Sequence, residues 1–264
     1  MSLLVASLNS GSNGNCYYIG NNHEAVLVDC GISHREVVRR LKRLNLSIEN
    51  VKAIFITHEH NDHVAGVAVV SRKHQIPVYI SAKTRQHFNF EVDEKLICTF
   101  ESNEEIKLGN LAITSFPKQH DAVDAHSVIV QSKNTCAGVF TDLGKPCRNA
   151  IRYFKLCHAA FLETNYDEEM LEAGSYPLAL KNRVRGDYGH LSNKQALKLF
   201  IDHRPPFMSH LFLSHLSQNN NSPTLVENLF QPWAGETEII IASRKNESAL
   251  YRVGKVHYEQ LQLF

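Results

Sequence analysis

The sequence has 264 residues, 43% of them hydrophobic and 21% charged, and a formal net charge of +1 at pH 7. These values are ordinary for a globular chain that is long enough for one large α/β domain. They exclude overall positive charge as the source of affinity for nucleic acid or a membrane surface, so a polyanion would have to be attracted by metal ions and local arginines.

Short apolar runs bounded by turn residues alternate along the chain with amphipathic helical patterns. In chain order, the pattern predicts strands over 3–8, 16–19 and 25–29, a helix over 33–44, a strand over 51–57, a helix over 64–73, strands over 77–80, 111–116, 127–131 and 138–142, a helix over 148–156, a strand over 159–163, a helix over 192–201, and strands over 210–214 and 238–243. Strands and helices are interleaved throughout. We therefore predict one domain over 1–264, in which two sheets lie between helices.

The most informative segment follows the predicted strand over 51–57 and reads HEHNDH. His58 and His60, two residues apart, can point at one metal ion from an extended loop. Asp62 and His63 then face a second ion close by. Two metal ions roughly 3.5–4 Å apart clamp the attacking and the leaving oxygen of a hydrolytic displacement. Chance clustering among the 15 histidines is the alternative, but the position of the segment between a strand and an amphipathic run favours a metal site.

A two-metal site needs more ligands than one loop supplies, and three other residues offer them. His120 follows a predicted strand, and Asp142 and His215 each close one. Ligands at the ends of several strands converge on one edge of a sheet, where open α/β sheets place their sites. Taken singly, a strand-end aspartate is more often a turn former or a helix cap. Together with the HEHNDH segment, the three residues indicate a ligand set for divalent metal ions.

The motif H-x-H-x-D-H, with the three later residues, resembles the metallo-β-lactamase-fold hydrolases over essentially the whole chain. The resemblance implies an α/β fold, a four-layer αββα sandwich with two mixed sheets. It also implies two divalent metal ions, and His/Asp ligation suits both Zn²⁺ and Mn²⁺. The implied ligands are His58, His60 and His120 for one ion, Asp62, His63 and His215 for the other, and Asp142 as the bridge between them.

The resemblance gives Asp29 a supporting role behind the ligand loop. This residue ends a predicted strand, so an ordinary turn residue is the alternative interpretation.

The branch of the family can be narrowed. Gln119 before His120 departs from the glyoxalase-like and lactamase-like members, and true β-lactamases carry another residue in place of Asp142. The gaps between motifs are too short for the RNase Z substrate arm or for the inserted domain of the β-CASP nucleases. Four segments resemble the YycJ/WalJ-type branch, whose members are associated with DNA exonuclease activity: SGSNGN (10–15), TNYD (164–167), GHLSN (189–193) and LSQNN (216–220).

Two residues are candidates for proton transfer. Asp62 could accept the proton of the attacking water. His190 precedes a capping box, Ser192 to Gln195, that starts a predicted helix, and a helix N-terminus suits a phosphate. An imidazole there could donate a proton to the leaving oxygen, although a role in positioning the loop is the alternative.

Three residues are candidates for substrate binding. Ser192 lies at the predicted helix start, and Arg183 and Arg185 could contact further phosphates. A solvated basic loop accounts equally well for the two arginines.

The leading functional interpretation is a dinuclear metal-dependent phosphodiesterase that uses a metal-bridging hydroxide and acts on DNA, as an exonuclease. The alternatives are a small-molecule hydrolase of the same fold, for a cyclic phosphodiester, thioester or lactone, and a non-catalytic regulatory protein. The start of the sequence lacks the features of a signal peptide, no apolar run could span a bilayer, and the six cysteines form no C-x-x-C pair. We expect a cytoplasmic protein with reduced thiols and no membrane partner.

Overall fold

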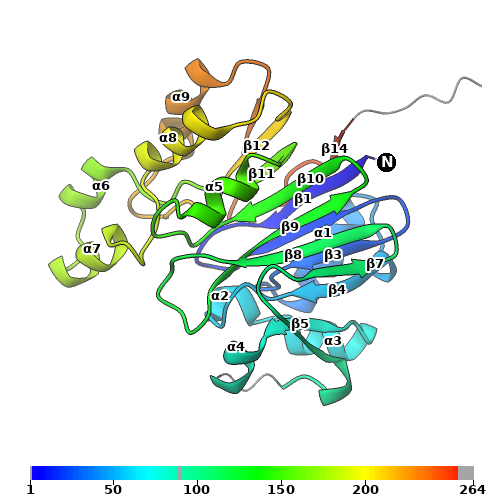
Figure 1. Ribbon diagram of the computed structural model, residues 1–264. Helices are drawn as coiled ribbons and strands as arrows, with labels where there is room; N and C mark the ends of the chain where they lie inside the picture. Colours follow the sequence, from blue (N-terminus) through cyan, green and yellow to red (C-terminus); the bar gives the residue numbers. More distant parts are fainter. Residues whose placement is uncertain (1, 88–90, 255–264) are drawn as a thin grey trace, which may run out of the picture.

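The computed structural model describes residues 2–87 and 91–254. Two seven-stranded sheets pack face to face, and helices cover the outer face of each, which makes four layers (Figure 1). The predicted αββα sandwich with two mixed sheets is therefore confirmed. The predicted single domain over 1–264 also includes residues 1, 88–90 and 255–264, which lie outside the described residues.

The first sheet has the strand order β14-β1-β2-β3-β4-β5-β6. Strands β3 to β6 run parallel, whereas β14, β1, β2 and β3 pair antiparallel. The bounds are β1 Leu3–Asn9, β2 Cys16–Gly20, β3 Ala25–Val28, β4 Val51–Phe55, β5 Val78–Ser81, β6 Ile97–Phe100 and β14 Tyr251–Val253.

The second sheet has the order β13-β12-β11-β10-β9-β8-β7. Strands β10 to β13 run parallel, and β7 to β10 pair antiparallel. The bounds are β7 Glu105–Leu108, β8 Leu111–Pro117, β9 His126–Ser132, β10 Thr135–Phe140, β11 Ala159–Glu163, β12 His210–Ser214 and β13 Glu238–Ile241.

Helices of the first half of the chain lie against the first sheet and helices of the second half against the other. The helices are α1 His34–Arg43, α2 Asn61–Val64, α3 Val67–His74, α4 Ala82–His87, α5 Arg148–Phe154, α6 Glu168–Ala173, α7 Leu178–Arg185, α8 Asn193–His203 and α9 Pro223–Phe230, with 3₁₀ turns at Ile48–Asn50, Glu94–Leu96 and Gln231–Trp233. None of the helices in the described ranges is long and apolar enough to cross a membrane.

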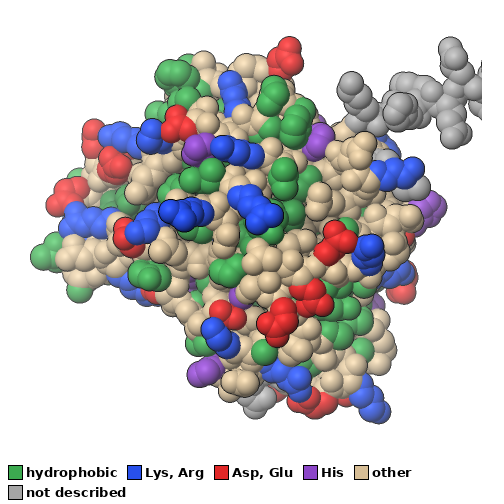
Figure 2. Space-filling model, viewed as in Figure 1, with side chains coloured by type: hydrophobic (Ala, Val, Ile, Leu, Met, Phe, Trp, Pro, Cys, Tyr) green, Lys and Arg blue, Asp and Glu red, His purple; other side chains and the backbone are tan. Residues whose placement is uncertain are grey.

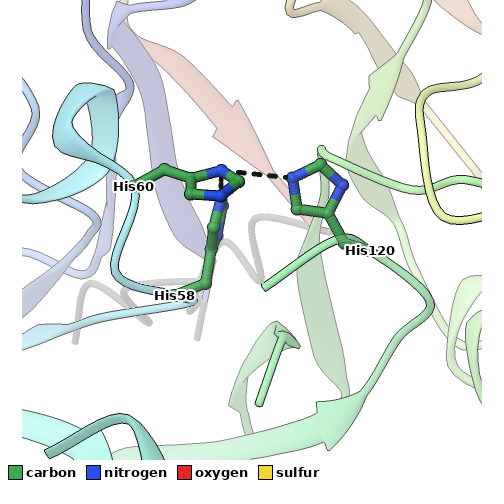
Figure 3. Close-up of side chains that lie close together, drawn as sticks. All are labelled: His58, His60 and His120. Carbon is green, nitrogen blue, oxygen red and sulfur yellow. Dashed lines mark hydrogen bonds between the residues drawn. The ribbon is translucent and has the colours of Figure 1, made fainter. Parts of the chain in front are cut away.

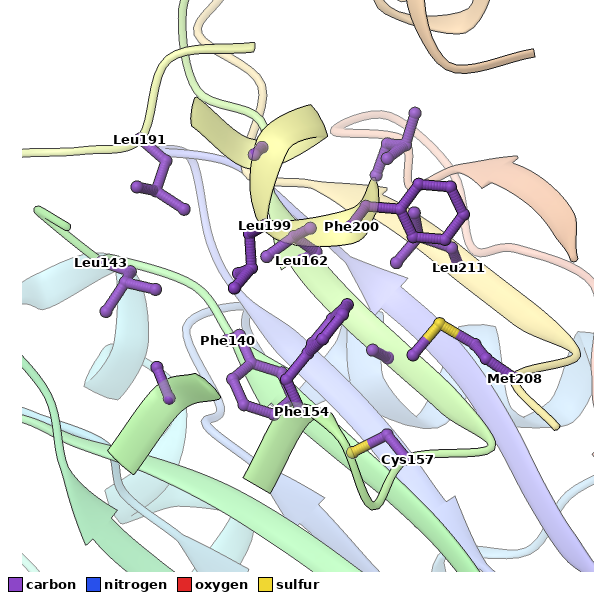
Figure 4. Close-up of a cluster of buried hydrophobic side chains, with 14 of the residues drawn as sticks. Phe140, Leu143, Phe154, Cys157, Leu162, Leu191, Leu199, Phe200, Met208 and Leu211 are labelled. Carbon is purple, nitrogen blue, oxygen red and sulfur yellow. The ribbon is translucent and has the colours of Figure 1, made fainter. Parts of the chain in front are cut away.

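Three apolar layers hold the sandwich together. Between the sheets, Tyr17 packs on Phe161 with ring centroids 4.8 Å apart, and Phe161 on Phe212 at 4.4 Å. Under α5 and α8, Phe154 and Phe200 lie among the aliphatic side chains of the second sheet (Figure 4). Each such ring or aliphatic side chain contributes about 1.5–3 kcal/mol when it is fully buried, so this scaffold fixes the strand ends that carry the site.

The prediction of one continuous helix over 64–73 was wrong. The structure has two helices, α2 and α3, separated by Ala65 and Gly66. Gly66 lies against the backbone of the preceding loop, because a Cβ there would come 2.0 Å from the carbonyl oxygen of Ile32. Its N–H also donates to the carbonyl of Cys30 at 2.8 Å. This contact with another part of the chain separates the two helices, and no local pattern encodes it.

Several short elements were not predicted: β6, β7, β14, α4, α6, α7 and α9. The edge strand β7 alternates exposed charged residues with half-buried apolar ones, so its four residues carry little apolar signal. The buried faces of α6 and α9 are likewise short. These elements depend on pairing and packing with distant segments.

The strand directions bring the candidate residues together. Strand β8 pairs antiparallel with β9, and β9 with β10, so β8 points the same way as the parallel strands β10 to β13. In the first sheet, β1 and the parallel strands β3 to β6 also share one direction. The loops after β1, β3, β4, β8, β10, β11 and β12 therefore emerge at one end of the sandwich.

Candidate metal centre and adjoining pocket

Three imidazoles face one another at this end of the sandwich (Figure 3). Nδ1 of His60 lies 3.1 Å from Nε2 of His58 and 3.4 Å from Nε2 of His120. His120 Nδ1 donates to the carbonyl of Gly189 at 3.0 Å, so its Nε2 presents a lone pair to the shared space. The loops after β4 and β8 thus bring three nitrogen donors within 4.8 Å of one another.

The second group consists of Asp62, His63 and His215, whose donor atoms also lie within 4.8 Å of one another. Oδ2 of Asp62 is 3.6 Å from Nε2 of both His63 and His215. Asn15 donates its Nδ2 to the same oxygen at 3.2 Å. Asp62 is therefore held in place from the loop after β1 while it faces the two imidazoles.

Asp142 lies between the two groups. Its Oδ2 is 3.1 Å from Nε2 of His63, and its Oδ1 is 3.8 Å from Nε2 of His120. Nδ1 of His215 is 3.4 Å from Oδ1. One buried carboxylate thus touches donors of both sets, which is the position that a bridging ligand requires.

Asp29 supports the first loop from behind. Its Oδ1 accepts the backbone N–H of Thr57 at 2.8 Å, and its Oδ2 accepts Thr57 Oγ1 at 2.9 Å and His63 Nδ1 at 2.7 Å. Thr57 Oγ1 has used its proton, so it accepts from Nδ1 of His58 at 2.8 Å. The carboxylate consequently orients the rings of His58 and His63 with their Nε2 atoms toward the centre.

Glu163 orients the imidazoles of His190 and His215, as Asp29 orients those of His58 and His63. The sequence analysis gave Glu163 no role. It is fully buried at the end of β11, and its Oε1 accepts Nδ1 of His215 at 2.9 Å and Nδ1 of His190 at 2.8 Å. Its Oε2 accepts the backbone N–H of Leu143 at 2.7 Å and of Leu191 at 3.2 Å. The sequence did carry a signal for Glu163, because a carboxylate is the last residue of a predicted apolar strand.

The pKa values of these groups follow from burial and from their carboxylate partners. Burial lowers the pKa of His120 to about 4 and, with the charge of His63, lowers the pKa of His58 well below its usual value. Burial opposes a charge on His63, but Asp29 and Asp142 raise its pKa to about 10. For His215, burial has the same opposing effect, and Asp142, Asp62 and Glu163 raise the pKa well above its usual value.

The carboxylates remain ionised despite their burial. Burial alone would raise the pKa of Asp142. The charges of His215 and His63 nevertheless hold this pKa well below its usual range. The charge of His190, together with hydrogen bonds from His190 and His215, lowers the pKa of Glu163 to about 2 against the same effect of burial. The centre therefore holds fixed negative charge at Asp142, where cations are to bind.

The donor set fits divalent metal ions. His215 Nε2 is buried and has no hydrogen-bond partner within the described part of the chain. Three imidazole nitrogens that face one another cannot all be satisfied by hydrogen bonds between themselves. Imidazole and carboxylate are the ligands that borderline divalent metals prefer, so the chemistry of this cluster suits divalent metal ions.

Three of these residues have an uncommon backbone conformation. Asp29, Asp142 and His215 have φ angles of 59°, 53° and 58°. Non-glycine residues in this left-handed region cost of order 1–3 kcal/mol when the backbone is strained there, and they cluster at functional sites. Each turn directs a side chain from the end of a strand back across the sheet edge, toward the partners described above.

A pocket of about 170 Å³ opens beside this centre. His190, His215 and Arg183 belong to its wall. Arg183 is hydrogen-bonded to Asp121 and keeps 61% of its side chain exposed. Arg185 lies outside the lining, where it pairs with Glu172 at 3.1 Å. The two arginines therefore have different surroundings.

Ser192 begins α8. The predicted capping box is confirmed, because its hydroxyl accepts the N–H of Gln195 while the side chain of Gln195 accepts the N–H of Ser192. The hydroxyl also donates to Glu168 at 3.0 Å, and the residue has no exposed surface. Direct contact between Ser192 and a substrate would require this arrangement to open.

Comparison with known proteins agrees with the fold. Residues 10–97 match the family model of the metallo-beta-lactamase superfamily. The chain is 34% identical over 230 residues to exodeoxyribonuclease YycJ of Bacillus anthracis, with 85% of this chain and 86% of the relative covered. It is 33% identical over 219 residues to exodeoxyribonuclease WalJ of Streptococcus pneumoniae serotype 2, with 81% of each covered.

A solved structure shows the same fold at much lower identity. The metallo-beta-lactamase fold protein YhfI from Bacillus subtilis superposes with a TM-score of 0.73 at 14% identity and covers 96% of this chain. The chain belongs to the metallo-beta-lactamase superfamily, in the family of YycJ and WalJ.

Proposed function

We propose that this protein is a metal-dependent phosphodiesterase that shortens DNA from an end, an exodeoxyribonuclease. The observation that carries the proposal is the pair of donor groups joined by the buried carboxylate of Asp142. Relatives that match more than four fifths of the chain are named exodeoxyribonucleases, which supports DNA as the substrate.

Two divalent ions, Zn²⁺ or Mn²⁺, would complete the centre. One would bind His58, His60 and His120, and the other would bind Asp62, His63 and His215, with Asp142 common to both. When bound, two such ions supply Lewis acidity to the phosphodiester and make water a nucleophile near neutral pH.

The protein's own residues move the protons. Asp62 is partly exposed, and Asn15 holds its Oδ2 toward the shared space, so we assign it the proton of the attacking water. Nδ1 of His190 is engaged by Glu163, which leaves Nε2 as the nitrogen that can give a proton to the leaving oxygen. The carboxylate thus orients the ring for this transfer.

A basic surface on α5, the helix that follows Asp142 in the chain, suits a phosphate backbone. Between Leu143 and Leu162 the chain has four Lys or Arg residues and no Asp or Glu. Arg148, Arg152 and Lys155 are exposed along α5 and form no ion pair with any residue in 2–87 or 91–254. Figure 2 shows Lys and Arg side chains spread over the face that carries α5. Such unpaired cations bind nucleic acid by displacing its counterions.

Substrate contacts are also proposed for Arg183, Arg185 and Ser192. Arg183 is the best placed of the three, since it lines the pocket next to His190. Arg185 would contact the strand farther from the centre. Ser192 would act indirectly, by capping the start of α8, since the N–H groups of Asn193 and Gln195 are engaged by Tyr166 and by Ser192 itself.

The proposal is tested with metal-loaded protein and end-labelled single- and double-stranded DNA, beside bis(p-nitrophenyl) phosphate and a thioester. Stepwise shortening of DNA that disappears in the His60→Ala and Asp142→Ala variants is the expected result. Turnover of the thioester with intact DNA would contradict it and would favour a small-molecule hydrolase.

A further inference from the structure

Lys118 is a buried lysine that directly follows β8, and the residue is 8% exposed. Lysine is almost never buried without a partner, because taking an ammonium group out of water costs free energy. The Nζ of Lys118 donates to the backbone carbonyl of Thr141 at 2.7 Å. Lys118 forms no ion pair with a carboxylate of the ranges 2–87 and 91–254. The position of Thr141 therefore indicates what this ammonium group does.

Thr141 immediately precedes Asp142, the carboxylate that lies between the two donor groups. The carbonyl of Thr141 and the N–H of Asp142 belong to one planar peptide unit. The φ angle of Asp142, 53°, describes the rotation of the residue relative to that unit. A hydrogen bond that fixes the carbonyl of Thr141 therefore fixes the peptide unit from which Asp142 turns back toward the centre.

We propose that Lys118 is a positioning residue that holds Asp142 in its left-handed conformation and so directs this carboxylate toward both donor groups. The inference rests on the proposed function, in which Asp142 is common to two metal ions. A non-glycine residue with a positive φ angle persists only where the surrounding structure holds it there. The hydrogen bond from Lys118 supplies this restraint on the peptide unit before Asp142.

The peptide unit after Asp142 is restrained as well. The N–H of Leu143 donates to Oε2 of Glu163 at 2.7 Å, and Glu163 is fully buried. A buried cation thus holds the carbonyl before Asp142, and a buried anion holds the N–H after it. Hydrogen bonds to charged groups are stronger than those between neutral groups. Asp142 is therefore held from both sides, and loss of the contact with Lys118 would leave the preceding peptide unit free to rotate.

The arrangement of the strands explains why a long side chain is needed. Strand β9 lies between β8 and β10, so the strands that lead to His120 and Asp142 do not pair with each other. Neighbouring strands are about 4.8 Å apart, and only a long side chain can cross from β8 past β9. The two loops also meet at Gln119, whose carbonyl accepts the N–H of Gly144 at 2.8 Å. Lys118 thus ties the loop of one candidate ligand to the turn of another.

The test is a double-mutant cycle for metal affinity that combines Lys118→Met with Asp142→Ala. Methionine is a long, apolar side chain that removes the hydrogen bond and the charge. The electrostatic energies of separate fixed charges with a bound ion add. Loss of the ammonium charge should therefore change the affinity for Zn²⁺ by the same factor with and without Asp142. Loss of positioning acts only where Asp142 is present.

The cycle gives a clear expected result. The factor by which Lys118→Met changes the association constant for Zn²⁺ should be at least about tenfold less favourable in the protein that contains Asp142 than in the Asp142→Ala background. Titration against a chelator of known affinity measures all four proteins. Equal factors in the two backgrounds would overturn the inference.

A matched control separates positioning from a general loss of stability. Ile113 is on β8, the strand that Lys118 follows, and is fully buried between the sheets. Ile113→Ala leaves a cavity and lowers the free energy of unfolding, but the residue lies away from the turn at Asp142. Its effect on the association constant should therefore be the same in both backgrounds. A dependence on Asp142 as large as that of Lys118→Met would assign the result to destabilisation and contradict the inference.

A further measurement uses the wild-type protein and does not depend on the folding of a variant. In isotope-labelled, metal-free protein, a scalar coupling across the hydrogen bond should connect Nζ of Lys118 with the carbonyl carbon of Thr141. An Nζ signal of Lys118 without this coupling would overturn the inference. Failure of the proposed function would look different: metal-loaded wild-type protein would leave DNA intact, while the cycle and the coupling would still show the role of Lys118.

Discussion

Oε1 of Glu163 accepts a hydrogen bond from Nδ1 of His190 at 2.8 Å, although 27 residues separate the two in the sequence. The same oxygen accepts Nδ1 of His215 at 2.9 Å. One carboxylate therefore orients a candidate metal ligand and a candidate proton donor together. Substitution of His190 should therefore affect proton transfer, whereas substitution of Glu163 should also affect metal binding through His215.

His190→Ala should lower the turnover number on DNA by about 10²–10⁴, the usual contribution of a general acid. Its effect on bis(p-nitrophenyl) phosphate should be much smaller, because p-nitrophenolate leaves without being protonated. Steady-state kinetics on both substrates measure the difference. Equal losses on both would assign His190 to positioning instead of proton transfer.

Glu163→Gln should affect both substrates. The amide cannot accept from His190 and His215 as the carboxylate does, so the ring of His215 loses its fixed orientation and metal affinity should fall about 10–100-fold. Metal titration against a chelator of known affinity checks this. In His190→Ala, which keeps the carboxylate, metal affinity should remain that of wild type. A Glu163→Gln variant with unchanged metal affinity would contradict this role for Glu163.

Metal binding should become tighter as the pH rises. The pKa of His63 is raised to about 10, and that of His215 is also raised, by their carboxylate partners. Both rings therefore hold protons in the metal-free protein at pH 7, and a bound ion must displace them. The logarithm of the association constant should increase with pH up to about pH 10, with one unit per pH unit for each proton released. Calorimetry in buffers of different ionisation enthalpy measures the proton release.

The same shift predicts the pH dependence of stability without metal. The raised pKa of His63 stabilises the metal-free fold fully below the unfolded-state pKa, about 6.5, and this contribution is lost as the pH rises through about 10. The thermal midpoint of chelator-treated protein should fall between pH 7 and pH 10. A metal-free midpoint that rises over this interval would contradict the assignment.

Neutralising α5 should weaken DNA binding. The triple variant Arg148→Gln, Arg152→Gln and Lys155→Gln removes up to three phosphate contacts, so the salt dependence of log K should become shallower by up to about 0.9 per lost contact on duplex DNA. Fluorescence anisotropy with the inactive Asp142→Ala protein as background measures it.

A matched control removes three cations from the other side of the sandwich. The variant Lys42→Gln, Arg72→Gln and Lys73→Gln changes exposed residues of α1 and α3, which cover the first sheet. Its affinity and salt dependence should match the parent protein. If both triple variants weaken binding equally, the effect is one of net charge and α5 has no special part.

Local sequence was sufficient for much of the site. The ligand segment after β4 could be predicted because its residue types and spacing are those of a metal-binding loop. His120, Asp142 and His215 could be added because each follows an apolar run that forms a strand. Parallel strands bring their carboxyl ends to one edge, so sequence position alone implied convergence.

Only the tertiary structure decided which groups act together. Glu163 ends β11 like any strand-end residue. Its role appears when β12 pairs beside β11 and carries His215 to its Oε1, while the loop before α8 carries His190 to the same oxygen. The pocket depends on side chains as far apart as Ser12 and Asn220. Local patterns in the sequence indicate which residues are buried and where the chain turns. Hydrogen-bond partners and cavity walls follow from packing between distant segments, and no periodicity along the chain indicates that packing.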